Sequence, residues 1–146
     1  MQEKIIIVDF GSQYTQLIGR RIRELNVYSE IHPYNNIPEI DENVKGVILS
    51  GSPFSVLDEK APQYDFNQIK SQLPLLGVCY GAQLMSHTFG GVVSPSETRE
   101  YGRANLNFVN SNNILLEGVS NNSQVWMSHG DTIKSTPDNF EIIAST

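Results

Sequence analysis

The sequence predicts an α/β fold, a doubly wound and mostly parallel open sheet with flanking helices. Short apolar runs that can form buried strands alternate with segments of helical periodicity, the order typical of such sheets. The first run, residues 4–8, is rich in β-branched residues and lacks polar alternation, as expected for a strand covered on both faces. The chain has 146 residues, 39% hydrophobic and 18% charged, so we expect one globular domain, residues 1–146, with a sizeable core.

The first half of the chain supplies the parallel part of this prediction. Residues 13–25 are predicted to form a helix because apolar side chains recur at helical spacing, at Tyr14, Leu17, Ile18, Ile22 and Leu25. Apolar runs at 28–32, 46–50 and 75–78 predict three further strands, and a second helix should run from about residue 83 to the glycines at 90–91.

The second half has a different pattern. Apolar and polar residues alternate over 104–109, which predicts a half-exposed, antiparallel strand. Residues 125–127 and 140–143 are predicted to be further short strands, and residues 128–131 a turn after the first of them. Because the sequence stops directly after the last strand, we expect the chain to lack the C-terminal part of its domain.

Charge and cysteine content narrow the class of protein. The net charge is −6 and the isoelectric point is near 4.9, which argues against a nucleic-acid partner. The one basic cluster, residues 20–23, falls on the predicted first helix and is interpreted as a solvated or docking face. A single cysteine cannot form an internal disulfide, and no apolar run reaches membrane-spanning length, so we expect a cytoplasmic protein without a membrane partner.

That single cysteine is the strongest chemical signal in the sequence. Cys79 falls between a predicted strand and a predicted helix, with Gly77 and Gly81 two residues to either side. This is the spacing of a nucleophile elbow with sulfur in place of the serine hydroxyl. The positive end of the helix dipole favours a thiolate at such a position. The alternative is a small buried structural cysteine.

A second loop is predicted at the same edge of the sheet. Ser50-Gly51-Ser52-Pro53 follows a buried strand but lacks the Lys-Ser/Thr pair of a phosphate-binding P-loop. Exposed backbone N–H groups in this loop suit a tetrahedral oxyanion better than a nucleotide. A plain β-turn is the alternative.

A thiolate hydrolase also needs a group that carries protons. His32 precedes a proline at a strand end, and His87 lies two turns into the helix after the cysteine, too far to touch the sulfur. His129, with Asp131 two residues further on, is the remaining candidate for a base and its orienting group. A histidine that only holds backbone geometry fits the pattern equally well.

Several segments together resemble one family. Gly77-Val78-Cys79-Tyr80-Gly81-Ala82-Gln83 looks like the nucleophile segment of the triad-type, class I glutamine amidotransferases. The segment from Asp9 to Ile18 followed by Arg20-Arg21, and the segment Trp126 to Asp131, look like the branch that aminates xanthosine monophosphate in guanine nucleotide synthesis. The resemblance runs from residue 4 to the last residue.

The resemblance implies a role for each matching residue. Cys79 would attack the carboxamide of glutamine, release ammonia and form a γ-glutamyl thioester, with the backbone N–H groups of Ser52 and Tyr80 as the oxyanion hole. Glutamine would be held by Gly51, Gln83, Ser128, His129, Gly130 and Asp131. The family implies no cofactor or metal in this domain, ATP and Mg²⁺ in a separate synthetase domain that takes the ammonia, and a homodimer formed through the missing C-terminal part.

The chain departs from the family pattern at two places. Ser52 stands where the family usually has glycine, so a side chain crowds the turn, and a positive φ there would be costly. The catalytic histidine and glutamate of the family lie in a Phe-His-Pro-Glu-like segment that this chain does not contain. The resemblance therefore assigns His129 to substrate holding, and residues 1–146 alone are expected to be inactive as a glutaminase.

Two other functions stay open on the sequence. One is the ammonia-supplying subunit of another pathway, such as anthranilate or carbamoyl phosphate synthesis, which the segment Gly11 to Tyr14 disfavours. The other is a non-catalytic docking module that keeps the fold and the elbow.

Overall fold

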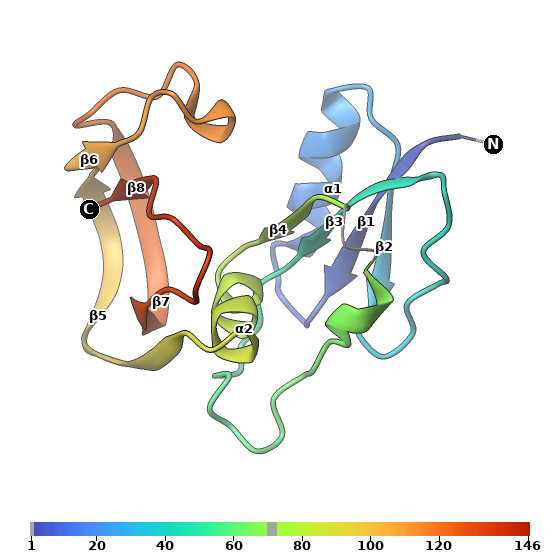
Figure 1. Cartoon of the computed structure of the whole chain (residues 1–146), viewed down its shortest axis with the longest axis horizontal. Coiled ribbons are helices and arrows are strands. Elements are labelled where there is room, and N and C mark those ends of the chain that lie inside the picture. The colour runs from blue at the N-terminus through green and yellow to red at the C-terminus, as the bar shows by residue number, and fades with distance from the viewer. Residues whose placement is uncertain (1, 70–72) are drawn as a thin grey trace. The chain divides into compact units, whose positions relative to one another are not determined.

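The computed structural model describes residues 2–69 and 73–146 and divides the chain into two compact units, residues 1–88 and 89–146 (Figure 1). The elements of the first unit are β1 Lys4–Asp9, α1 Thr15–Glu24, β2 Ser29–Pro33, β3 Val44–Leu49, a 3₁₀ turn Phe66–Gln68, β4 Leu75–Gly77 and α2 Tyr80–Thr88. Those of the second unit are β5 Val92–Asn105, β6 Phe108–Val109, a 3₁₀ turn Ile114–Leu116, β7 Gln124–Ser135 and β8 Ala144–Ser145.

The first unit is built on a four-stranded sheet in the order β2-β1-β3-β4. All three strand pairs are parallel, which confirms the predicted parallel sheet and its strands in the first half of the chain. Ile6, Ile7 and Val8 in the centre of β1 are 0% exposed, as expected for a strand covered on both faces.

The two helices of this unit pack on opposite faces of the sheet. Gly19 of α1 lies against Ile7 and Ile31, which are partners in the parallel register and so share one face. Gly81 of α2 lies against Leu49 of β3. The preceding residue, Ile48, pairs with Ile7, so Leu49 projects to the opposite face of the sheet. Both expected helices and the doubly wound arrangement are thus present.

One face of α1 meets the sheet. Thr15 and Gly19 are its buried residues, and Ile18 and Ile22 on the same face are half-buried, as the apolar spacing predicts. The other apolar residues of the pattern are exposed: Leu17 on α1 by 51%, and Tyr14 and Leu25, just outside the helix, by 55% and 76%. A Cβ at position 19 would already lie 3.1 Å from Ile31 Cδ1, so the glycine lets the helix approach the sheet closely.

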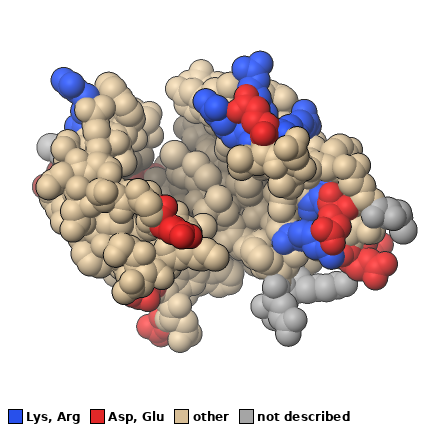
Figure 2. Space-filling view, turned by 90° about the horizontal axis from the view of Figure 1, so that it is seen from above, with Lys and Arg blue, Asp and Glu red and all other residues tan. Residues whose placement is uncertain are grey.

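The basic cluster lies on the exposed side of α1, as expected. Arg21 forms an exposed ion pair with Glu24 at 2.9 Å, and Arg23 donates to the carbonyl of Ser29 at 3.0 Å. Lysine and arginine side chains lie next to acidic side chains on the face shown in Figure 2, consistent with this pair and with the ion pair between Lys45 and Glu3.

The second unit consists of antiparallel strand pairs, β5 with β7 and β6 with β8. The antiparallel character predicted for residues 104–109 is confirmed, but the single strand is wrong: β5 begins at Val92 and ends at Asn105, and β6 begins at Phe108 in another sheet. The predicted strand over 140–143 is wrong: this segment is irregular, and the short strand β8 begins only at Ala144. Asn139, at φ 66°, precedes the irregular segment, and Ala144 is the first residue that finds a strand partner, in β6.

The predicted turn over 128–131 is also wrong, because β7 continues through it to Ser135. His129 pairs with Glu100 and Asp131 pairs with Pro95 across the β5–β7 ladder. The register shifts between Pro95 and Glu100, so an irregularity in β5 accommodates a segment whose serine, glycine and aspartate favour a turn locally.

Candidate active site

The chain turns sharply between β4 and α2. β4 ends at Gly77, α2 begins at Tyr80, and Cys79 between them has a φ of 50°. A non-glycine residue in this left-handed region costs about 1–2 kcal/mol, which surrounding contacts must offset. Cys79 is exposed, so the structure confirms the elbow and contradicts the alternative of a buried structural cysteine.

Two glycines allow this turn, as the sequence predicts. A Cβ at Gly77 would lie 2.6 Å from the backbone nitrogen of Ala82, and a Cβ at Gly81 would lie 2.8 Å from the carbonyl carbon of Leu49. Both distances are shorter than carbon and nitrogen atoms can approach without bonding. Strand β3, strand β4 and the first turn of α2 can therefore meet here only where side chains are absent.

The loops after β1 and β3 reach the same place. After β1 the chain continues to β2 at one edge of the sheet, and after β3 it continues to β4 at the other edge. The carboxyl ends of the neighbouring strands β1 and β3 therefore form the topological switch point. A Cβ at Gly51 would lie 3.5 Å from Ser12 Oγ and 3.7 Å from Cys79 Cβ. Gly51 therefore lies between the loop after β1 and the thiol-bearing turn.

Two backbone N–H groups are available beside the thiol. Tyr80 N–H belongs to the first residue of α2 and has no acceptor within the helix, and Ser52 N–H follows Gly51. Neither group donates a hydrogen bond to any of the residues that the structure describes. These are the two donors expected from the sequence for an oxyanion hole.

Ser52 fits its position without backbone strain. Among the described residues, the non-glycine positions with positive φ are Asn26, Cys79, Asn122 and Asn139, so Ser52 avoids the left-handed region that would penalise a side chain. Its Oγ accepts a hydrogen bond from Phe54 N–H at 3.2 Å. The side chain thus stabilises the loop that contains it.

The side chain of Tyr80 is anchored away from the thiol chemistry. It is 2% exposed, its hydroxyl donates to the carbonyl of Pro62, and its ring packs 5.3 Å from that of Phe10. Burial raises the pKa of Tyr80 to about 12, with smaller contributions from the charges of Asp58 and Tyr34. The phenol therefore stays protonated at neutral pH and cannot serve as the base.

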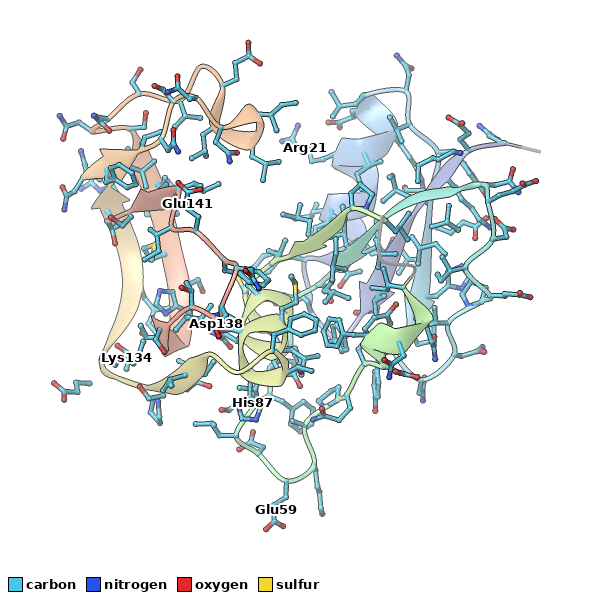
Figure 3. All side chains as sticks on the ribbon, viewed as in Figure 1. Arg21, Glu59, His87, Lys134, Asp138 and Glu141 are labelled. Atoms are coloured by element: carbon cyan, nitrogen blue, oxygen red, sulfur yellow. The ribbon has the colours of Figure 1, made fainter. Side chains whose placement is uncertain are left out.

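The three histidines lie in different surroundings. His32 Nε2 lies 3.0 Å from Glu30 Oε2 at the end of β2, and His87 is exposed on the last turn of α2 (Figure 3). His129 is half-buried in β7, with Nδ1 2.9 Å from the backbone oxygen of Asp131. Since a carbonyl oxygen only accepts, Nδ1 carries the proton in that contact, and it is the backbone of Asp131 that orients the ring there.

The residues expected to hold glutamine are divided between the two units. Gly51 and Gln83 belong to the first unit, and Gln83 is half-buried on the first turn of α2, with its N–H donating to the carbonyl of Cys79 at 3.0 Å. Ser128, His129, Gly130 and Asp131 belong to the second unit, where they form part of β7. Their contact with glutamine stays a prediction.

Sequence reasoning missed the role of one residue that organises this site, Ser50, the first residue of the Ser50-Gly51-Ser52-Pro53 loop. It is 0% exposed at the end of β3 and bonds to all three loops. In the sequence, Ser50 looks like any serine in a turn. No local pattern distinguishes it from Ser52, two residues further on.

No group of three or more histidine, cysteine or acidic side chains within residues 2–69 and 73–146 is placed to hold a metal ion. Over the same residues, no helix has the length and apolar character needed to cross a membrane.

Comparison with known proteins agrees with this geometry. A family profile described as Glutamine amidotransferase class-I matches residues 6–146, and the chain belongs to that family. The chain is 64% identical over all 146 residues to a GMP synthase [glutamine-hydrolyzing] of Cytophaga hutchinsonii, and 63% identical to that of Bacteroides fragilis. It spans 29% of the length of each of these curated relatives.

Solved structures show the same fold. A protein of Thermoplasma acidophilum superposes with a TM-score of 0.76 at 27% identity, over 100% of this chain and 74% of its own. A glutamine amidotransferase of Thermotoga maritima superposes with a TM-score of 0.74 at 18% identity, over 99% of this chain and 67% of its own. At 18% identity, the similarity to the Thermotoga maritima protein supports the fold alone.

Proposed function

We propose that this chain carries the thiol half of the glutaminase site of a GMP synthetase. The observation that carries the proposal is the exposed Cys79 at φ 50°, next to Gly51 and to two N–H groups that have no acceptor among the described residues. The 64% identity to a GMP synthase [glutamine-hydrolyzing] supports the choice of this enzyme over other ammonia-supplying amidotransferases.

The reaction follows from the geometry of the elbow. The Cys79 thiolate attacks the side-chain carbonyl carbon of glutamine, and Tyr80 N–H and Ser52 N–H stabilise the oxygen that becomes negative. The carbon–nitrogen bond then breaks, a proton goes to the leaving nitrogen, and ammonia departs. Water hydrolyses the thioester to glutamate and restores the thiol.

The proton carrier is not the phenol of Tyr80, the residue that follows Cys79, because burial holds it protonated. His32 contacts Glu30 at the end of β2, and His87 is exposed on the last turn of α2. We assign this role to a histidine and glutamate pair outside this chain, as the family pattern implies. Residues 1–146 alone would then bind and orient without turning glutamine over.

The ammonia would be used by a synthetase portion of the same enzyme. That portion would activate xanthosine monophosphate with ATP and Mg²⁺ and release GMP. Like the amidotransferase part, it would act in the cytoplasm, in an enzyme that forms a homodimer and has no nucleic-acid or membrane partner.

The test is Cys79→Ala in the natural full-length protein. Alanine keeps the Cβ of cysteine, so the strained backbone is unchanged and only the sulfur is lost. We expect glutamine-dependent GMP formation to disappear and ammonia-dependent formation to stay within about twofold of the wild type. His87→Ala, at an exposed position on the helix that follows Cys79, is the control.

The measured activities distinguish a structural cysteine from an enzyme of another pathway. Equal loss of both activities would mean that the cysteine is structural and would refute the proposed nucleophile. Glutamate release without GMP formation in the wild type would instead indicate an amidotransferase of another pathway.

A further inference from the structure

Ser50 joins the three loops of the site through a single buried residue. Its N–H donates to the carbonyl of Val8 at 3.1 Å, and its carbonyl accepts from Gly81 N–H at 3.0 Å. Its Oγ accepts from Phe10 N–H at 3.0 Å and donates to the carbonyl of Gly51 at 2.9 Å. Ser50 therefore connects β1 and the loop after it, the Gly51–Ser52 loop and the start of α2.

The direction of the Ser50 hydroxyl bond is determined by its neighbours. A serine hydroxyl has one proton, and Phe10 N–H, which can only donate, approaches its oxygen. The proton is therefore free to point at Gly51 O, which can only accept. Ser50 itself is 0% exposed, so its hydroxyl does not reach water, whereas Gly51 is half-buried.

The bond from Ser50 controls a peptide that the proposed reaction uses. The carbonyl of Gly51 and the N–H of Ser52 belong to one peptide unit, and the described residues contain no cis peptide bond. In a planar trans peptide the C=O and the N–H point in opposite directions. Holding Gly51 O toward Ser50 therefore fixes the direction of Ser52 N–H.

Gly51 makes such control necessary. The Gly51–Ser52 peptide turns about ψ of Gly51 and φ of Ser52, and glycine, which has no Cβ, restricts ψ less than any other residue. Without a bond to its carbonyl, the Gly51–Ser52 peptide could turn Ser52 N–H away from the thiol side of the loop. A preorganised donor, by contrast, needs no rearrangement when charge develops on the substrate oxygen.

We propose that Ser50 is a positioning residue of the glutaminase, whose hydroxyl holds the Gly51–Ser52 peptide so that Ser52 N–H serves as an oxyanion donor. This inference rests on the proposed function and adds a residue that acts through the peptide rather than by touching glutamine. The Ser50 hydroxyl also connects the Gly51–Ser52 peptide to the loop after β1, because the same hydroxyl accepts a hydrogen bond from Phe10 N–H.

The test compares Ser50→Ala with Ser29→Ala in the natural full-length protein. Ser29 is a matched control, because it is 1% exposed, its Oγ donates to the carbonyl of Gly19 at 3.4 Å, and it lies at the start of β2, away from the carboxyl ends of the strands. We expect Ser50→Ala to lower kcat for glutamine hydrolysis by about 10- to 100-fold, less than loss of a whole oxyanion donor. KM for glutamine and ammonia-dependent GMP formation should change less than about threefold.

A second readout reports on the oxyanion hole itself. Glutamate γ-semialdehyde adds the Cys79 thiol to form a tetrahedral hemithioacetal, so its affinity depends on the oxyanion donors. We expect Ser50→Ala to weaken this affinity by about the same factor as kcat, while the rate of Cys79 alkylation by iodoacetamide stays the same. Ser29→Ala should alter neither quantity.

Four results would overturn the assignment. They are an unchanged kcat in Ser50→Ala, an unchanged semialdehyde affinity, an equal loss in Ser29→Ala, and an equal loss of ammonia-dependent activity. Ser50→Thr keeps the hydroxyl and decides the matter if the alanine variant does not fold: near wild-type kcat supports the proposal, and a folded but inactive threonine variant refutes it. Failure of the proposed function would be seen separately, as a wild type that does not hydrolyse glutamine.

Discussion

Replacing Gly81 with alanine tests how the thiol-bearing turn is held. The new Cβ would lie 2.5 Å from Leu49 Cβ and 2.8 Å from the carbonyl carbon of Leu49. Backbone atoms cannot move aside as a side-chain tip can, so we expect an overpacking cost of about 3 kcal/mol, the upper end of the usual range. The displaced N–H of residue 81 also loses its bond to the carbonyl of Ser50, worth about 1 kcal/mol.

Part of this cost is offset by helix propensity. Alanine is favoured over glycine within a helix by up to about 1 kcal/mol. The net expectation for Gly81→Ala is a loss of about 3 kcal/mol in the free energy of local opening around α2. A difference of 1.4 kcal/mol is a factor of ten, so amide exchange there should become roughly 100-fold faster.

Gly19→Ala is the matched control in the same unit. Gly19 is also a buried helical glycine, but a Cβ there would press only on the far end of a flexible side chain, Ile31 Cδ1, at 3.1 Å. We expect its stability to stay within about 1 kcal/mol of the wild type, because propensity and crowding nearly cancel.

Hydrogen–deuterium exchange of peptides that cover β3 and α2, read in the full-length protein, measures the effect locally. Glutaminase kcat should fall in Gly81→Ala and stay unchanged in Gly19→Ala. Equal protection of the α2 peptides in the two variants would refute the claim that close backbone approach holds this turn.

Two further substitutions test other parts of the structure. His129→Ala in the full-length protein should mainly raise KM for glutamine, because a residue that only holds the substrate binds the ground state and the transition state equally. A kcat lower by about a thousandfold at unchanged KM would instead show that His129 is the base. The bond from His32, and next that from Lys4, holds the pKa of Glu30 below its usual 4.5, so Glu30 stabilises the fold above that pH and loses this effect as the pH falls through its folded pKa. Glu30→Gln should therefore lower thermal stability at pH 7, by less than about 1 kcal/mol, and its difference from the wild type should shrink as the pH falls from 4.5 through the folded pKa of Glu30. Glu59→Gln, at an exposed position (Figure 3), should have no effect over this range. A Glu30→Gln deficit that does not shrink with falling pH would contradict this.

Elements with strong local signals were predictable from the sequence. The β-branched run of β1, the helical spacing in α1 and the glycines on either side of Cys79 each act within a few residues. The elbow was therefore predictable, since Gly77 and Gly81 reveal a close crossing without knowledge of the partner.

In the second unit, the residues at which strands begin and end depend on pairing with other strands. The local sequence pattern does not contain this information. Residues 140–143 have the composition of a strand but lie outside the β6–β8 ladder. Residues 128–131 have the composition of a turn, yet β5 supplies partners for His129 and Asp131 and keeps them extended. A strand is stabilised by hydrogen bonds to another strand, so its limits are a tertiary property.

By itself, the sequence determined that a thiol lies on a sharp turn between a buried strand and a helix, because glycine spacing and periodicity are local. The sequence also predicted that the loop with Gly51 lies at the same edge of the sheet, since the carboxyl ends of parallel strands meet there. Only the tertiary structure showed that Gly51 lies between Ser12 and Cys79. Tertiary structure also decided the role of Ser50. Its hydroxyl has a function only because Phe10 N–H and the Gly51 carbonyl, which are distant from each other in the chain, converge on it.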